Sequence, residues 1–276
     1  MPELPEVEIV ARSLGKLVTG RLIIDAVLLR ERLSPETSPS QFAGLLQRTS
    51  ILTVGRRGKH ILIALDNGRT LIVHLRMSGR FSLLKEEDEN PKFTHAIFNF
   101  EDSERLVFDD QRHFGMMKIV STDRLGDAKE LAKLAPEPFT NEFSLAYFRN
   151  CLSRSSRNLK EFLIDQTKVC GLGNIYASEA MFAARVDPRQ AANRLSAPKA
   201  RRLFDSIRAV LSEAIGHDQL GPIDPANIEG GYFSGSQGGW LVYGREGEPC
   251  RVCGSAVKRL KQGGRSTYFC PKCQRR

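Results

Sequence analysis

The opening of the chain shows helical spacing of its apolar residues. Between residues 5 and 18, valine, alanine and leucine recur at intervals of three and four, so that they share one face of a helix. Pro5 suits the first turn of that helix, because a residue there needs no hydrogen-bonded N–H. The sequence therefore predicts an amphipathic helix at the start of the chain, with its apolar face buried.

Beyond this helix, short apolar-rich runs separated by turn residues predict antiparallel strands. Asp66-Asn67-Gly68 marks one tight hairpin turn, and the polar residues 101–104 mark a second. Residues 34–40 and 85–92 contain proline among polar residues and are predicted to be loops. The predicted strands cover residues 22–29, 61–65, 70–75, 95–100 and 106–108.

The pattern changes near residues 131–138, and helical spacing dominates after them. The clearest case is the apolar series from Leu203 to Ile215, which is entered through Ser196 and Pro198. A glycine-rich stretch at 216–239 is predicted to be a long loop, and loops of that length are usually functional. The order of these elements predicts an α+β protein of more than one domain.

Charge and length narrow the class of protein. The chain has 276 residues, enough for two domains, and a formal net charge of +9. That excess of positive charge suits a polyanionic partner, with nucleic acid preferred over an anionic membrane. No apolar run approaches the length of a membrane span, and no signal peptide precedes the opening MPELPEVE. We therefore expect a cytoplasmic protein without a membrane partner.

Four of the six cysteines form two Cys-x-x-Cys pairs, on either side of residues 254–269. Cytoplasmic thiols stay reduced, so this spacing predicts a four-thiolate zinc ribbon with a hairpin between the pairs. Four thiolates leave no position for water, so one structural zinc ion is expected. Lysine and arginine follow Glu248 without another acid, which suits phosphate binding. The predicted ligands are Cys250, Cys253, Cys270 and Cys273.

Three stretches carry a family resemblance: residues 2–8 (PELPEVE), 171–179 (GLGNIYASE) and 243–250 (YGREGEPC). With the terminal ribbon, they resemble the formamidopyrimidine-DNA glycosylase and endonuclease VIII family, and the bacterial formamidopyrimidine branch most closely. The resemblance implies a helix–two-turn–helix element around 158–184. The expected domains are an N-terminal antiparallel β-sandwich with a leading helix (1–131), a helix–two-turn–helix domain with a lesion-covering loop (132–240) and the zinc ribbon (241–276).

The resemblance gives the acidic, proline-rich opening a chemical meaning. Once Met1 is removed, Pro2 carries a secondary amine, and the family uses this amine as its nucleophile. An ordinary α-amino group titrates near ~8, against ~10.4 for lysine, so more of it is unprotonated at neutral pH. Glu3 corresponds to the family's acid/base group. Glu6 is expected to support the amine, although both acids would also suit a helix start for structural reasons alone.

The resemblance also implies which residues contact DNA. Base chemistry of this kind requires an extrahelical nucleotide, and the family fills the resulting gap with three side chains, which implies Met77, Arg112 and Phe114 here. Lys59 and Arg265 match catalytic-site phosphate clamps of the family. The remaining expected DNA contacts are His74, Asn174, Tyr243 and Arg259.

The chain also departs from the family pattern. Many relatives have Asp-Pro-Arg-Arg-Phe-Gly where this chain has Gln111 and His113, and the missing proline predicts a softer loop. Ser78 replaces an acid found in some 8-oxoguanine enzymes. The sequence of residues 222–239 is unusual for the loop that covers the flipped base. These differences bear on base preference rather than on backbone cleavage.

The prediction is a base-excision-repair DNA glycosylase with AP lyase activity, acting on 8-oxoguanine and formamidopyrimidines in duplex DNA opposite cytosine. Two alternatives stay open: an endonuclease VIII-like preference for oxidised pyrimidines, and a non-catalytic zinc-ribbon binder of damaged DNA. An N-terminal-proline tautomerase is a more distant alternative, because it gives no reason for the ribbon or the basic tail. The resemblance further implies a bacterial, nucleoid-associated monomer.

Overall fold

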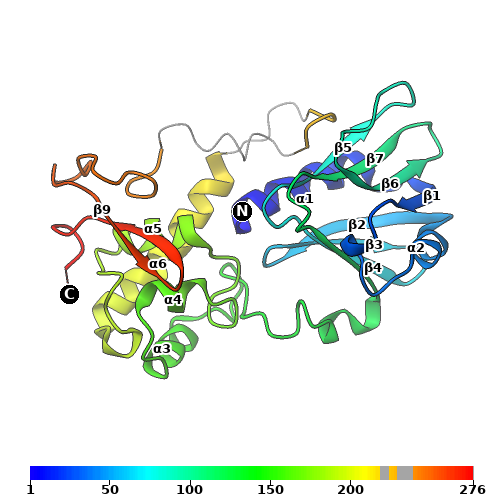
Figure 1. Cartoon of the computed structure of the whole chain (residues 1–276). Coiled ribbons are helices and arrows are strands. Elements are labelled where there is room, and N and C mark those ends of the chain that lie inside the picture. Colours follow the sequence, from blue (N-terminus) through cyan, green and yellow to red (C-terminus); the bar gives the residue numbers. More distant parts are fainter. Residues whose placement is uncertain (218–223, 229–238, 276) are drawn as a thin grey trace. The chain divides into compact units, whose positions relative to one another are not determined.

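The computed structural model describes residues 1–217, 224–228 and 239–275. The described chain forms two compact units. The first contains Met1–Ala132 and residues 224–228, and the second contains residues 133–217 and 239–275 (Figure 1). The first is built on an antiparallel sheet with helices, and the second on helices with a two-stranded hairpin. The predicted α+β fold class is confirmed. The boundaries of the three expected domains stay a prediction.

The predicted leading helix is α1 (Leu4–Val18), and its buried face includes Val7, Val10 and Leu14. A second helix, α2 (Pro39–Leu46), was not predicted. Ser38 caps it by accepting a hydrogen bond from the Gln41 N–H at 3.3 Å. The prediction of a loop through residue 40 and of a single helix in this region was therefore wrong. The serine, proline and glutamine at 38, 39 and 41 are a helix-start signal.

Eight antiparallel strands form one sheet in the order β5-β7-β6-β1-β2-β3-β4-β8. The strands of the two halves of this order lie in two layers (Figure 1). The buried core of this unit includes Phe42, Phe81, Phe98 and Phe108. The two predicted hairpins are present, as β3–β4 and β6–β7. The strands are β1 (Leu22–Leu28), β2 (Thr49–Arg57), β3 (His60–Leu65), β4 (Arg69–His74), β5 (Gly79–Leu84), β6 (Thr94–Phe100), β7 (Arg105–Asp110) and β8 (Met116–Ser121).

The sheet brings two of its loops together. Strand β4 pairs with β8 at His74↔Met116, and β5 pairs with β7 at Gly79↔Asp110. The β4–β5 loop (residues 75–78) and the β7–β8 loop (residues 111–115) therefore leave the sheet at the same end. Short 3-10 turns at Glu31–Leu33 and Thr122–Asp127 complete the connections.

The second unit holds helices around an aromatic core of Phe143, Phe148, Phe162 and Phe204. A 3-10 turn at Ala192–Arg194 precedes the longest helix. This helix includes Gly216, so the predicted loop at 216–239 begins later than expected. Residues 218–223 and 229–238 of that loop lie outside the described residues. The helices are α3 (Leu145–Ser153), α4 (Leu159–Ile164), α5 (Asn174–Ala183) and α6 (Ala197–His217).

The cysteine-rich segment forms the predicted hairpin, β9 (Lys258–Gln262) and β10 (Arg265–Phe269). Phe182 of α5 packs with Val242 and Val257 and with two of the cysteines in one buried cluster. Gln274 donates to the Val186 carbonyl at 2.9 Å, which attaches the end of the segment to the helices. Across the described residues, no helix is both long and apolar enough to cross a membrane.

Candidate active site

The first residues of the chain are held in place by the start of α1. Pro2 and Glu3 are buried, and Glu3 is only 2% exposed. Glu3 is the N-cap residue of α1, and Glu6 occupies the third helical position. The two form a reciprocal capping box, in which the Glu3 N–H donates to Glu6 Oε2 at 2.7 Å. Glu6 therefore has a structural role as well, because it fixes the backbone of Glu3.

Burial makes the amino group at this end less basic. The pKa of the Met1 amino group is lowered from its ordinary value of 8.0, chiefly because burial disfavours the charged form. The nearby carboxylates Glu3 and Glu6 oppose this shift, and the cations Lys59 and Arg112 add to it. An amine at this place is surrounded by two acids and two cations, and all four are residues of the first unit.

Lys59 lies in the tight turn between β2 and β3. The turn consists of Gly58 and Lys59, with Arg57 paired to His60, and Gly58 has a φ of +59° that suits glycine. Arg56 donates to the Gly58 carbonyl at 2.9 Å and pairs with Glu8 at 2.8 Å. Glu8 lies on α1, so this ion pair joins the lysine turn to the helix that carries Glu3. Lys59 is 5% exposed.

His74 is a buried neutral histidine. Its pKa is lowered to about 2 by burial first and then by His60, Arg76 and Lys59. Its Nδ1 accepts a hydrogen bond from the Arg76 N–H at 3.0 Å. A neutral ring whose Nδ1 accepts must carry its proton on Nε2. His74 can therefore offer an N–H donor to an anion, but not a positive charge.

Met77, Arg112 and Phe114 lie on the two adjacent loops. Met77 is 37% exposed and Phe114 is 56% exposed, although both are large apolar side chains. The Arg112 guanidinium lies 5.5 Å from the centre of the Phe114 ring. Arg76 and His113, the residues before Met77 and Phe114, have φ values of +56° and +60°. The structure thus brings the three predicted insertion residues to one end of the sheet and leaves them accessible.

Asn174 begins α5, directly after Gly173. Gln166 fixes the glycine-rich turn before it, because it accepts from the Gly171 N–H at 3.0 Å and donates to the Leu172 carbonyl at 2.8 Å. The Asn174 carbonyl accepts from the Lys160 ammonium at 2.8 Å. The Asn174 Oδ1 atom is buried, and it is one of the side-chain oxygens without a hydrogen-bond partner among the described residues.

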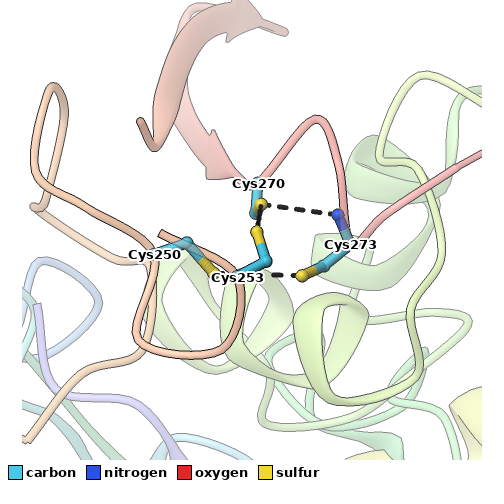
Figure 2. Close-up of side chains that lie close together, drawn as sticks. All are labelled: Cys250, Cys253, Cys270 and Cys273. Atoms are coloured by element: carbon cyan, nitrogen blue, oxygen red, sulfur yellow. Dashed lines mark hydrogen bonds between the residues drawn. The ribbon is translucent and has the colours of Figure 1, made fainter. Parts of the chain in front are cut away.

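The four predicted cysteine ligands converge (Figure 2). Their sulfur atoms all lie within 4.8 Å of one another. The Cys250–Cys273 and Cys253–Cys270 sulfur distances are 3.9 and 3.4 Å. Four sulfurs at about 2.3 Å from a tetrahedral zinc ion are about 3.8 Å apart, so the set fits zinc. Burial raises the pKa of Cys273 to about 12, while hydrogen bonds from Ser255 lower that of Cys253 to about 6.

The hairpin beside this cluster displays the expected cations. Arg265 is the exposed first residue of β10. Arg259 pairs across the hairpin with Tyr268. The ring of Tyr268 packs edge-on against that of Tyr243, with the two ring centres 5.2 Å apart. Arg259 also forms an ion pair with Glu246 at 2.6 Å, and both side chains are about half exposed. An exposed pair of this kind is worth ~0–1 kcal/mol, so a phosphate could replace Glu246 at little cost.

Three sequence models of known domains match the chain in order. They describe the formamidopyrimidine-DNA glycosylase N-terminal domain (residues 1–117), the H2TH domain of the same proteins (134–223) and a zinc finger found in FPG and IleRS (247–276). Formamidopyrimidine-DNA glycosylase of Listeria innocua is 40% identical over the whole of both chains. That of Heliobacterium modesticaldum is 41% identical, again over the whole of both chains.

The chain belongs to the formamidopyrimidine-DNA glycosylase family. Solved structures agree with this assignment. Lactococcus lactis formamidopyrimidine-DNA glycosylase bound to DNA with an AP site matches with a TM-score of 0.89 and 34% identity, covering 99% of this chain and 100% of that one. The same enzyme bound to DNA containing N7-benzyl-Fapy-dG matches with a TM-score of 0.90 and 33% identity over both whole chains. The protein is therefore a DNA repair glycosylase with a zinc-finger domain.

The structure adds two buried residues of this glycosylase that sequence reasoning did not single out. Lys160 is fully buried, and its ammonium binds the Asn174 carbonyl and the Ser178 hydroxyl at 2.8 and 2.9 Å. Glu179 is 5% exposed and accepts three backbone N–H groups from residues 241–243. Glu179 was within reach of prediction, because it is the one charged residue of α5 and lies in the GLGNIYASE stretch.

Proposed function

We propose that the protein is a bifunctional glycosylase and AP lyase that removes 8-oxoguanine and formamidopyrimidines from duplex DNA, through an amine at Pro2. The observation that carries the proposal is the setting of the amino-terminal end. Pro2 is buried, and at the amino group of Met1, directly before it, burial lowers the pKa while Glu3, Glu6 and Lys59 supply nearby charges. Once Met1 is removed, the proline nitrogen takes the terminal position in this setting. An amine that is unprotonated at neutral pH is a competent nucleophile.

The chemistry begins when the nitrogen of Pro2, exposed by loss of Met1, forms a bond to C1′ of the damaged nucleotide. The glycosidic bond breaks, its electron pair leaves with the base, and the base takes up a proton. The proline nitrogen then gives up its proton, and its electron pair forms the C=N bond as the C1′–O4′ bond breaks and O4′ takes up a proton. This leaves a cationic iminium between the proline nitrogen and C1′. Loss of a C2′ proton expels the 3′ phosphate, and a second elimination expels the 5′ phosphate.

Glu3 suits the proton transfers of this sequence, and Lys59 suits the phosphate beside the sugar. Glu3 is held at the N-cap of α1 by the capping box with Glu6, which limits the positions that its carboxyl group can take. Lys59 is fixed by its tight turn and by the Arg56–Glu8 ion pair. Glu6 therefore supports catalysis by positioning Glu3.

The extruded base leaves a gap that Met77, Arg112 and Phe114 can fill. Their exposure on adjacent loops supports this role, and the guanidinium of Arg112 can bond to the unpaired cytosine.

Phosphates would be held by Lys59, by the Nε2–H of His74, by Asn174 and by Arg265, with Tyr243 and Arg259 as secondary contacts. Cationic contacts of this kind predict a steep loss of DNA affinity as salt rises.

One structural zinc ion on Cys250, Cys253, Cys270 and Cys273 completes the proposal. The sulfur distances fit a tetrahedral ion, and the four thiolates leave no position for water or substrate. When bound, zinc supplies a crosslink between the two ends of the β9–β10 hairpin. The cysteines thereby order the hairpin that displays Arg265. The expectations of a monomer and of a cytoplasmic, nucleoid-associated location stay predictions.

Borohydride trapping tests the proposal. The purified protein is mixed with a duplex that carries one 8-oxoguanine opposite cytosine, and any adduct is mapped by peptide mass spectrometry. We expect the adduct on Pro2, and we expect Pro2→Gly to lose most of the strand nicking. Pro5→Gly is the matched control, since it removes a proline from the same helix start without touching the amine. Full nicking by Pro2→Gly contradicts the proposal.

A preference for oxidised pyrimidines is the second candidate. The Lactococcus lactis enzyme, 34% identical to this chain, has a structure with DNA that contains an oxidised pyrimidine. The trapping experiment is therefore repeated with such a lesion and with an abasic site. Trapping only on the pyrimidine duplex would favour this candidate. No trapping on any duplex, with Met1 absent from the protein, would favour a non-catalytic binder of damaged DNA.

A further inference from the structure

The two loops that carry Met77, Arg112 and Phe114 rest on the same aromatic ring. Gly79 directly follows the β4–β5 loop as the first residue of β5, and Gly115 is the last residue of the β7–β8 loop. A Cβ atom added at Gly79 would lie 2.6 Å from the Phe108 ring, and one added at Gly115 would lie 2.8 Å from it. Only glycine permits such close approach. Phe108, which is fully buried, therefore sets how closely the backbone of both loops can approach the sheet.

Asp110 fastens the β7–β8 loop from within. It has no exposed surface, and its carboxylate needs hydrogen-bond donors there. Oδ2 accepts from the Gly115 N–H at 2.6 Å, and Oδ1 accepts from the Arg112 N–H at 3.2 Å. The Asp110 carbonyl also accepts from the His113 N–H at 3.2 Å. These bonds close the loop without the proline that Gln111 replaces.

Ser78 connects this arrangement to the other loop. It follows Met77 directly, and its hydroxyl donates to Asp110 Oδ1. The Ser78 Oγ atom also accepts from the Arg112 N–H at 2.9 Å. One hydroxyl thus bridges the residue after Met77 to the backbone of Arg112, although Ser78 and Arg112 are 34 positions apart in the sequence.

A second contact holds the middle of the β7–β8 loop. His113, between Arg112 and Phe114, lies with its Nδ1 2.9 Å from His95 Nε2 of strand β6. The two rings are stacked with their centres 5.0 Å apart. His95 is 4% exposed, so the pair ties an exposed loop residue to a buried strand residue.

We propose that Ser78 is a positioning residue that makes the two loops act as one insertion element. This inference rests on the proposed function, in which Arg112 bonds to the cytosine opposite the lesion. The hydroxyl of Ser78 fixes the Arg112 backbone relative to Met77, so the guanidinium meets the opposite base from one defined place. Ser78 thereby contributes to the discrimination of cytosine from other opposite bases, without touching DNA itself.

The test measures single-turnover excision of 8-oxoguanine from two duplexes, one with cytosine and one with adenine opposite the lesion. The ratio of the two rates does not depend on how much of a preparation is folded. We expect Ser78→Ala to lower the ratio roughly tenfold, which corresponds to about 1.4 kcal/mol. Ser78→Thr keeps a hydroxyl and should keep the ratio. Ser82→Ala is the matched control, because Ser82 is a buried serine of the same strand region.

The outcomes separate the two proposals. If wild-type protein traps on Pro2 and prefers cytosine, but Ser78→Ala keeps the wild-type ratio, the inference about Ser78 is wrong and the proposed function stands. The inference is also wrong if Ser78→Thr loses as much discrimination as Ser78→Ala, since the hydroxyl would then not be the cause. If wild-type protein forms no adduct on Pro2 with any duplex, the proposed function fails and the inference with it.

Discussion

Replacing Glu179 by glutamine should weaken the hydrogen bonds that attach the segment before the zinc finger to α5. Glu179 Oε1 accepts the N–H groups of Val242 and Tyr243 at 3.0 and 2.8 Å, and Oε2 accepts that of Leu241 at 2.8 Å. A glutamine keeps the shape but offers one oxygen, and its amide nitrogen cannot accept a bond. At least one of the three N–H groups, each buried or partly buried, then loses its acceptor, and the other bonds lose their charge.

The expected loss can be worked from these contacts. A hydrogen bond to a charged group is worth ~1.5–3 kcal/mol, and a buried N–H left without a partner costs ~1–3 kcal/mol. We therefore expect Glu179→Gln to lower the free energy of unfolding of the second unit by about 2–4 kcal/mol. Trp240 is the only tryptophan, and it packs edge-on against Tyr176 at 5.5 Å, so its fluorescence reports on this segment.

Urea unfolding followed by Trp240 fluorescence measures the change, and release of zinc to a coloured chelator gives a second readout. Glu142→Gln is the matched control, because Glu142 is an exposed carboxylate of the same unit. The control should alter the free energy of unfolding by less than about 0.5 kcal/mol. If Glu179→Gln unfolds at the same urea concentration as this control, the three backbone contacts do not stabilise the segment and the reasoning is refuted.

Three further results are expected. The free energy of unfolding should fall by about 3 kcal/mol as pH drops from 6.5 towards 4, because burial lowers the pKa of His60 to about 4 and only the unfolded chain takes up the proton in this range. His74 acts in the same direction. Urea titrations of the wild type and of His60→Gln at several pH values check this. Removing zinc with a chelator should unfold the β9–β10 hairpin and abolish duplex binding, and returning zinc should restore both. Hydrogen exchange over residues 247–275 measures the folding of the hairpin, and a gel shift measures the binding. Arg56→Ala should cost about 2 kcal/mol of stability and slow Pro2 trapping, with Arg56→Lys less affected; equal trapping rates would contradict the link to the Lys59 turn.

Features that follow from local patterns could be predicted from the sequence. The spacing of apolar residues located α1 and α6, the Asp66-Asn67-Gly68 turn located a hairpin, and the cysteine spacing located the metal cluster. In each case the residues that decide the structure are close together in the chain. The helix α2 was missed although its signal was local, because proline among polar residues was read as a loop.

Contacts between distant residues could not be predicted. Ser78 and Asp110 are 32 positions apart, and Glu179 and Leu241 are 62 apart. Nothing near Ser78 in the sequence indicates a carboxylate partner, because the contact exists only after β5 pairs with β7. Likewise, the burial of Lys160 depends on how α4 packs against α5. The roles carried over from the family located candidate residues, whereas the structure supplied the contacts that hold them.

The left-handed backbone conformations of Arg76 and His113 have a consequence for binding thermodynamics. An L-residue other than glycine gives up roughly 1–2 kcal/mol to adopt this conformation, so the folded chain must hold it there. The residues that follow, Met77 and Phe114, thus project from loops whose conformational freedom is already restricted. A ligand that contacts their tips then loses less free energy in ordering them, and more of its contact energy remains as affinity.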